Sequence, residues 1–345
     1  MRILWLSPWL RPLARIYGEQ LRAAGDDVLL ITSEQHPQPA EPLDWEIVTD
    51  PRPKTLRTWP EFARVYRRAR AFKPDVVITE LVRDPRWLAL GALAPRVHFV
   101  HDDQPHGADE ERPRWEQALF DNWGRSASRT VCFSEYVADR VRPGRRPGSV
   151  AVVPLTSDLP DDVIAAPAAA ADRRDFVLVG RLNEYKNLPV VFDAWQRHVD
   201  GPGFRGDRLC LFGSAAQTPQ LPDSAWWNGG SYDYDAVLEP LRAAKGSIAH
   251  YRLATQSGVQ VLSMQLGVAP IVSTHGALPE FQPAAPDPIG PDDVAGLHAT
   301  FDLLADPDRA GDYGASAATH YRDRYAVDVA AASLRSILLQ AKDYR

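Results

Sequence analysis

Short apolar runs alternate with longer amphipathic stretches along the first half of the chain. Residues 3–6 and 28–31 have the composition of buried strands, and residues 13–24 between them repeat apolar positions at helical spacing. The same pattern predicts helices over 60–71 and 115–123 and strands over 76–78, 97–100 and 131–133. Because parallel strands need long crossover connections, this alternation predicts a parallel sheet with helices on both faces.

The alternation stops at an alanine-rich run and then restarts. Residues 165–171 have little apolar bulk and include Pro167, as expected for an interdomain linker. Beyond it we expect strands over 176–179, 209–212 and 269–273, helices over 188–198 and 236–244, and closing helices to Arg345. Residues 219–232 carry two tryptophans and two glycines without periodicity and are expected to form a loop, with at least one indole packed inward.

The predicted fold class is therefore α/β, with two Rossmann-like parallel-sheet domains facing a central cleft. We place the domains at 1–164 and 174–326, a linker at 165–173, and a final segment at 327–345. The length of 345 residues suits two cores rather than one.

Composition narrows the possible partners. The net charge of −6 argues against a general affinity for nucleic acid or for anionic membranes, so a phosphate-bearing ligand must be met by local cations. Cys132 and Cys210 lie in apolar runs, which indicates buried, reduced thiols. No apolar run approaches the roughly 20 residues of a membrane helix, so we expect a cytoplasmic protein, with peripheral membrane association through Trp and Arg side chains left open.

Residues 176–187, FVLVGRLNEYKN, form the first candidate binding motif. An apolar strand ends at Gly180, and Arg181 and Lys186 follow before the next helix. Glycine allows a tight turn, the two cations can pair with phosphate oxygens, and a helix start offers free backbone N–H groups. The motif predicts a diphosphate site; a solvated basic loop is the alternative.

At these residues the sequence resembles retaining glycosyltransferase family 4. Gly180, Arg181, Lys186 and Asn187 match the family's Gly-Arg and Lys-Gly/Asn motif, and LCLFGS at 209–214 and SMQLGVAPIVSTHGALPEF at 263–281 are similar to its later motifs. The resemblance implies a GT-B fold, a nucleotide-sugar donor and a final helix that crosses back to the first domain. It also implies these donor-binding residues: Gly180, Arg181, Lys186, Asn187, Gly213, Ser214, His275, Gly276, Ala277, Leu278 and Glu280.

The first half resembles the family only in the order of its strand motifs. His101 ends a predicted strand, where open parallel sheets bind ligands, and it matches a family position near the donor sugar. We expect His101 and Asp102 to be the catalytic residues. Ser134 and Glu135 are weaker candidates and serve equally well as helix caps.

Two regions depart from the family. The two glutamates expected before the 263–281 motif are replaced by Ala254 and Leu262, and Gln256 or Gln260 could supply part of the lost hydrogen bonding. The first loop, SPWLRPLARIYG, has Trp9 and two prolines in place of the usual glycines. Trp9, Arg11 and Arg15 are therefore expected to contact the acceptor, since a ring can stack on Trp and an acid can pair with Arg.

Two short sequences suggest a metal site. Asp233-Tyr234-Asp235 spells an Asp-x-Asp, but in a two-domain chain we expect it to cap the helix at 236–244. His101 to His106, HDDQPH, offers two histidines and two aspartates, and its place after a strand favours a sugar site. We predict no metal and no cofactor, with the nucleotide sugar as co-substrate.

The sequence thus predicts a metal-independent, retaining glycosyltransferase of the hexosyltransferase type. It would transfer a sugar to an acceptor hydroxyl in bacterial surface-polysaccharide biosynthesis or natural-product glycosylation. The missing glutamates leave open a GT-B relative with other chemistry, such as an epimerase or a pseudo-sugar coupling enzyme, and a non-catalytic partner subunit. A nicotinamide dehydrogenase ranks last because no G-x-G-x-x-G follows the first strand.

Overall fold

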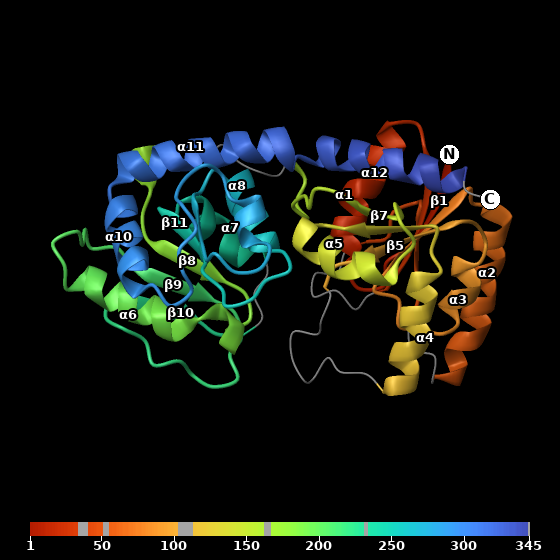
Figure 1. Cartoon of the computed structure of the whole chain (residues 1–345), viewed down its shortest axis with the longest axis horizontal. Coiled ribbons are helices and arrows are strands. Elements are labelled where there is room, and N and C mark those ends of the chain that lie inside the picture. The colour runs from red at the N-terminus through yellow and green to blue at the C-terminus, as the bar shows by residue number, and fades with distance from the viewer. Residues whose placement is uncertain (34–40, 51–54, 103–112, 162–166, 231–233, 344–345) are drawn as a thin grey trace. The chain divides into compact units, whose positions relative to one another are not determined.

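The computed structural model describes residues 1–33, 41–50, 55–102, 113–161, 167–230 and 234–343. The chain divides into two compact units, one of residues 1–158 and 327–345 and the other of residues 159–326. Each unit is a parallel sheet covered by helices (Figure 1).

The first unit contains a seven-stranded sheet in the order β3-β2-β1-β4-β5-β6-β7, and every neighbouring pair is parallel. Its strands are β1 Arg2–Leu6, β2 Asp27–Thr32, β3 Glu46–Val48, β4 Val76–Glu80, β5 Arg96–Val100, β6 Arg129–Cys132 and β7 Val150–Val152. Its helices are α1 Arg11–Ala23, α2 Trp59–Phe72, α3 Trp87–Gly91, α4 Arg114–Arg125, α5 Glu135–Val141 and α12 Val327–Lys342, with short 3-10 turns at Leu56–Thr58 and Arg142–Gly144. The central strands are apolar on both faces because helices cover both sides of the sheet.

The last helix belongs to the first unit. In Figure 1, α12 (blue) lies beside α1 (red). Arg335 of α12 pairs with Asp26 at 2.7 Å, and Asp26 also accepts a hydrogen bond from the N-terminal amino group at 2.7 Å. Burial alone would raise the pKa of Asp26, but these hydrogen bonds outweigh it and hold the pKa below its ordinary value.

The second unit contains a five-stranded parallel sheet in the order β10-β9-β8-β11-β12. Its strands are β8 Phe176–Val179, β9 Leu209–Phe212, β10 Ala225–Asn228, β11 Gly246–Ala249 and β12 Pro270–Val272. Its helices are α6 Leu188–Val199, α7 Tyr234–Arg242, α8 Gly258–Gln265, α9 Leu278–Phe281, α10 Val294–Ala305 and α11 Pro307–Arg324, with 3-10 turns at Ala170–Asp172 and Glu184–Lys186. Phe176, Trp195 and Phe301 pack edge to face in its core, with ring centroids 5.1–5.6 Å apart.

The loop expected over 219–232 is wrong in part, because β10 pairs with β9 inside it. Trp227 packs against the core and its indole N–H donates to the Gly213 carbonyl at 2.8 Å, whereas Trp226 is 46% exposed and lies edge-on to Phe212. An edge strand only four residues long shows too little alternation to be recognised. The tryptophans therefore anchor an edge of the sheet.

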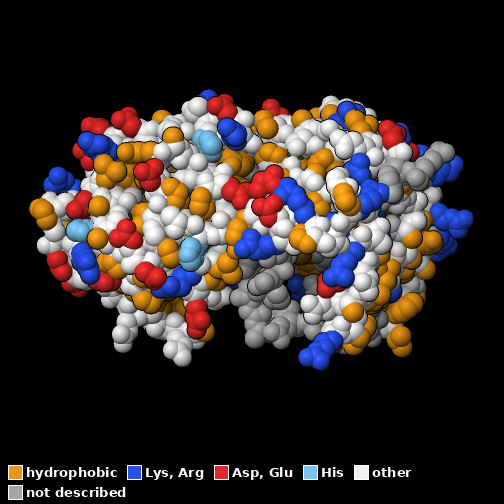
Figure 2. Space-filling model, in the orientation of Figure 1, with side chains coloured by type: hydrophobic (Ala, Val, Ile, Leu, Met, Phe, Trp, Pro, Cys, Tyr) orange, Lys and Arg blue, Asp and Glu red, His pale blue; other side chains and the backbone are white. Residues whose placement is uncertain are grey.

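Several smaller expectations have clear outcomes. Cys132 and Cys210 are buried free thiols, and burial raises their pKa values to about 12 and about 11. Ser134 is confirmed as a helix cap, since its hydroxyl accepts a hydrogen bond from the Val137 N–H at the start of α5. Among the described residues, no helix is both long and apolar enough to cross a membrane. Figure 2 shows acidic and basic side chains interspersed over the visible face.

Candidate functional site

In the first unit, the carboxyl ends of β4 and β5 bring Glu80 and His101 together. Glu80 is the last residue of β4, and His101 directly follows β5, its neighbour in the sheet. The His101 ring is 5% exposed and its Nε2 lies 2.7 Å from Oε1 of Glu80, which is completely buried. Glu80 was not predicted, although its position at a strand end is the same signal that selected His101.

Glu80 has a second donor. The indole N–H of Trp5 in β1 donates to its other carboxylate oxygen at 3.3 Å, and the His101 ring packs on Phe133 with centroids 4.8 Å apart. A carboxylate that accepts from Nε2–H fixes the imidazole tautomer and stabilises a protonated ring. This pair can therefore hold or move a proton at Nδ1. Asp102 is partly exposed beside His101, while Asp103 to His106 fall outside the described residues.

The residues expected to contact the acceptor lie in different surroundings. Arg11 is 3% exposed and pairs with Glu46 at 2.9 Å, and Arg15 holds the same carboxylate at 2.5 and 2.6 Å. Burial raises the pKa of Glu46, but the hydrogen bonds from both arginines outweigh it and keep the pKa below normal. These two guanidinium groups join α1 to β3. Trp9 stays on the loop after β1, where its ring contacts Arg83.

In the second unit, the predicted donor residues lie on loops at the carboxyl edge of the sheet. Gly180 has a φ of +115° and its N–H donates to Phe212. Gly213 has a φ of +139°, and a Cβ built there would lie 2.1 Å from the Gly180 carbonyl oxygen. Leu182 donates to the carbonyl of Ser214 at 2.8 Å, so the turns after β8 and β9 pack backbone to backbone.

Lys186 lies beneath the Gly180 turn. It is 3% exposed, and its ammonium donates to the Val179 carbonyl at 2.9 Å and to the Tyr251 hydroxyl at 2.7 Å. Burial, followed by the charge of Arg181, lowers the pKa of Lys186 to about 7. Arg181 itself is exposed. Tyr251 was missed because strand β11, which precedes it, was not predicted.

Asn187 lies at the end of the loop between β8 and α6. Its φ of +58° places it in the left-handed region at the start of α6, and it is fully buried. Its side-chain amide donates to the Pro291 carbonyl at 2.6 Å and lies 3.3 Å from His250 Nδ1. The structure therefore shows Asn187 fixing the end of the loop.

The loop after β12 carries the remaining donor residues. Its backbone is fastened to the loop after β11: Ala277 N–H donates to the Ala254 carbonyl at 2.8 Å, and His275 Nδ1 lies 2.8 Å from the Arg252 carbonyl. Gly276, with a φ of +66°, passes so close that a Cβ would meet the Ala254 oxygen at 2.0 Å. Leu278 is buried in the core, and Glu280 is exposed while its carbonyl accepts from the Tyr325 hydroxyl at 3.1 Å.

Ala254 and Leu262, the two positions that lack the family's glutamates, lie in the core, and Gln260 is occupied by packing contacts. Ala254 is 4% exposed and Leu262 is 5% exposed, and Leu262 belongs to an apolar cluster with Val179 and Phe212. Gln260 is fully buried and its amide donates to the Leu278 carbonyl at 3.1 Å and to Gln282 at 3.0 Å. Gln256, which is partly exposed, is therefore the better of the two glutamines to replace a missing carboxylate.

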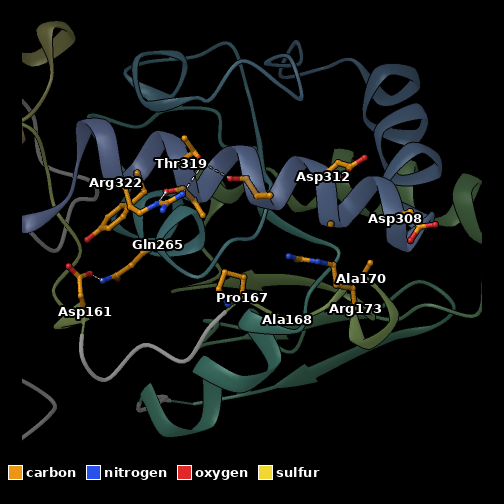
Figure 3. A pocket seen from close by; sticks show the side chains of 14 residues that line it. Asp161, Pro167, Ala168, Ala170, Arg173, Gln265, Asp308, Asp312, Thr319 and Arg322 are labelled. Atoms are coloured by element: carbon orange, nitrogen blue, oxygen red, sulfur yellow. Dashed lines mark hydrogen bonds between the residues drawn. The ribbon is translucent and has the colours of Figure 1, made fainter.

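The described residues contain a cavity of about 950 Å³ elsewhere in the second unit, under α11 (Figure 3). None of the predicted site residues lines it. Its polar groups hold the packing together: Arg173 donates to the carbonyls of Ala244 and Gly267, and Gln265 donates to Asp161 at 2.7 Å. We assign it no role in the candidate site.

No group of three or more His, Cys, Asp or Glu within the described part of the chain could hold a metal ion. Of the two sequences considered for metal binding, HDDQPH is described only at its first two residues. Asp233 also lies outside the described residues, and the side chain of Asp235 is not described.

Comparison with solved structures identifies the fold. Sucrose-phosphate synthase from Thermosynechococcus elongatus matches with a TM-score of 0.72 at 17% identity, over 99% of each chain. HepE from Anabaena, in complex with UDP and glucose, matches with a TM-score of 0.69 at 15% identity, over 99% of this chain and 100% of that one. The UDP-forming trehalose-phosphate synthase from Burkholderia xenovorans matches with a TM-score of 0.66 at 13% identity, over 99% of both chains. The protein has the GT-B fold of these glycosyltransferases.

Part of the sequence also matches a family model. Residues 14–159, most of the first unit, match the model of Glycosyltransferase Family 4, and together with the fold this match supports a glycosyltransferase. Comparison with curated proteins gives no match.

Proposed function

We propose that this protein is a retaining, metal-independent glycosyltransferase of the hexosyltransferase type, which moves a sugar from a nucleotide-sugar donor to an acceptor hydroxyl. The observation that carries this proposal is the buried Lys186 beneath the turn at Gly180 and Arg181. Its side-chain nitrogen donates to a carbonyl and a hydroxyl, and no carboxylate of the described residues is among its hydrogen-bond partners. A diphosphate at this turn would supply the missing negative charge.

The roles of the remaining residues follow from their chemistry. Arg181 and Lys186 would neutralise the charge that develops on the diphosphate as the glycosidic bond breaks. In the first unit, the Glu80–His101 pair would stabilise positive charge or move a proton at the reacting hydroxyl. Here Glu80 acts through His101, as a positioning residue. The protein would work in the cytoplasm, in surface-polysaccharide or natural-product glycosylation.

A thermal-shift screen against UDP-, GDP-, TDP- and ADP-sugars, with and without magnesium, tests the donor site. A ligand at about 100 times its dissociation constant should stabilise the protein by about 2.7 kcal/mol. Arg181→Gln should abolish the shift. Arg205→Gln is the matched control, since Arg205 is an exposed arginine that precedes β9 and so lies at the opposite edge of the same sheet.

The outcomes separate the proposal from its alternatives. A metal-independent shift that is lost in Arg181→Gln and kept in Arg205→Gln supports the donor site and identifies the nucleotide. If no nucleotide sugar stabilises the folded protein, the transferase proposal fails and a non-catalytic subunit becomes the better description. If a donor binds but incubation only interconverts sugars, the protein is an epimerase-type relative.

A further inference from the structure

The loops that follow β1 and β4 come together beside the Glu80–His101 pair. The two strands are neighbours, with Leu6 in register with Thr79, so both loops leave the same edge of the sheet. Trp9 lies on the first loop and Arg83 on the second, and the guanidinium carbon of Arg83 is 5.9 Å from the centroid of the Trp9 ring. Arg83 follows Glu80 by only three residues.

Arg83 is an exposed cation that no acid neutralises among the described residues; its ring contact with Trp9 is its sole interaction there. The nearby arginines differ. Arg11 and Arg15 are held by Glu46, and Arg86 is held by Asp84 at 2.7 Å. The loop therefore contains one carboxylate, Asp84, which pairs with Arg86, and Arg83 has no acidic partner within the described part of the chain.

The loop that carries Arg83 is firmly built. Val82 is buried in the core, and the buried Arg86 also donates to the Thr58 hydroxyl at 2.7 Å. Leu81 has a φ of +48°, a conformation that costs a non-glycine residue free energy. Backbone strain of this kind is often found at functional sites, where it presents a side chain in a fixed direction.

The loop after β1 offers donors that the protein leaves unused. The indole Nε1 of Trp9 and the hydroxyl of Ser7 are both buried and have no hydrogen-bond partner in the described structure. Buried polar atoms without partners are rare, because each costs free energy unless something binds it. The aromatic face and indole N–H of Trp9 thus lie beside a guanidinium that no described acid neutralises.

We propose that Trp9 and Arg83 form the acceptor subsite, and that the acceptor is a sugar-sized ring carrying an anionic group, either a phosphate or a carboxylate. The ring would stack on Trp9, and the planar guanidinium of Arg83 would pair with two oxygens of the anion. Arg83 would take the acceptor-binding role that was expected of Arg11 and Arg15. The inference rests on the proposed function, because it names the substrate class of that transferase.

Fluorine NMR of protein labelled with 5-fluorotryptophan tests the subsite. The chain has 10 tryptophans, and Trp9→Phe assigns the resonance of Trp9. The probes are glucose 6-phosphate, glucuronate, neutral glucose and inorganic phosphate, each titrated to concentrations on the order of 10 mM, where a millimolar dissociation constant is easily measured. The variants are Arg83→Gln, Arg83→Lys and, as a matched control, Arg64→Gln, which removes an exposed arginine of α2.

We expect one of the two anionic sugars to shift the Trp9 resonance, with glucose and inorganic phosphate binding at least about tenfold more weakly. Arg83→Gln should weaken binding by about tenfold or more, Arg83→Lys by less, and Arg64→Gln not at all. The two sugars distinguish a phosphate from a carboxylate. The proposal is overturned if neither shifts the resonance, if glucose or inorganic phosphate acts as strongly, or if Arg83→Gln binds normally.

The donor screen on the same samples separates this inference from the proposed function. If a nucleotide sugar binds but no anionic sugar reaches Trp9, the subsite is wrong and the transferase proposal stands. If anionic sugars bind through Arg83 while no nucleotide sugar binds, the transferase proposal fails and the anion site stands. Because Arg83 is exposed, its variants should unfold at the wild-type midpoint.

Discussion

The buried Lys186 makes the stability of the second unit depend on pH in a predictable direction. Its pKa is lowered from 10.5 to about 7, first by burial and then by Arg181. Between these two values the unfolded chain binds more protons than the folded chain, so the free energy of unfolding rises with pH. Below pH 7 the penalty for burying the ammonium is constant and largest, and above pH 10.5 it disappears.

The size of the effect follows from the shift. The pKa of Lys186 is lowered by 10.5 − 7 = 3.5. This corresponds to a penalty on the order of 5 kcal/mol for burying the charged side chain. Of this, roughly 2 kcal/mol is relieved between about pH 7 and pH 9. Lys186→Met fills a similar volume without a charge, so we expect it to be more stable than the wild type at neutral pH. The variant also loses the hydrogen bonds to Val179 and Tyr251, but that loss does not vary with pH in this range.

Urea denaturation of both proteins at several pH values between neutrality and pH 9 measures the difference. The two units can unfold separately, so the comparison uses the transition that the substitution moves. The advantage of Lys186→Met should shrink by roughly 2 kcal/mol as the pH rises. The exposed Lys342→Met is the control and should show no such trend. A difference that stays constant with pH would show that Lys186 remains protonated in the folded protein, and the reasoning would be refuted.

Two further substitutions test the site and the loop around it. Glu80→Gln keeps the shape of the residue that pairs with His101 but removes its charge. The kcat of transfer should therefore fall by about 100-fold with little change in KM. Full activity in the folded variant would contradict the positioning role of Glu80. Gly276→Ala should destabilise the protein by several kcal/mol, because its Cβ would meet the Ala254 oxygen at 2.0 Å at a φ of +66°. Gly25→Ala is the control, because Gly25 has a φ of +86° but no atom lies near its Cβ position. This substitution should lower the free energy of unfolding by only about 1 to 2 kcal/mol in a denaturation curve. Equal losses of stability in the two variants would show that the close approach at Gly276 is unimportant.

The sequence by itself determined the two-sheet architecture, because long helices and doubly buried strands leave strong periodic signals. It missed β3, β7, β10 and β11, which are only three or four residues long. Short strands are stabilised by their neighbours in the sheet, and those neighbours are not visible in a local pattern.

The sequence also placed single site residues at the ends of strands, but the tertiary structure alone decided their partners. Glu80 meets His101 across 21 positions, and Lys186 meets Tyr251 across 65. Arg11, the first residue of α1, is instead buried against Glu46, 35 residues away. The chemistry of a charged side chain depends on which opposite charge or dipole the fold brings within hydrogen-bonding distance, and that is set by strand order rather than by any local motif.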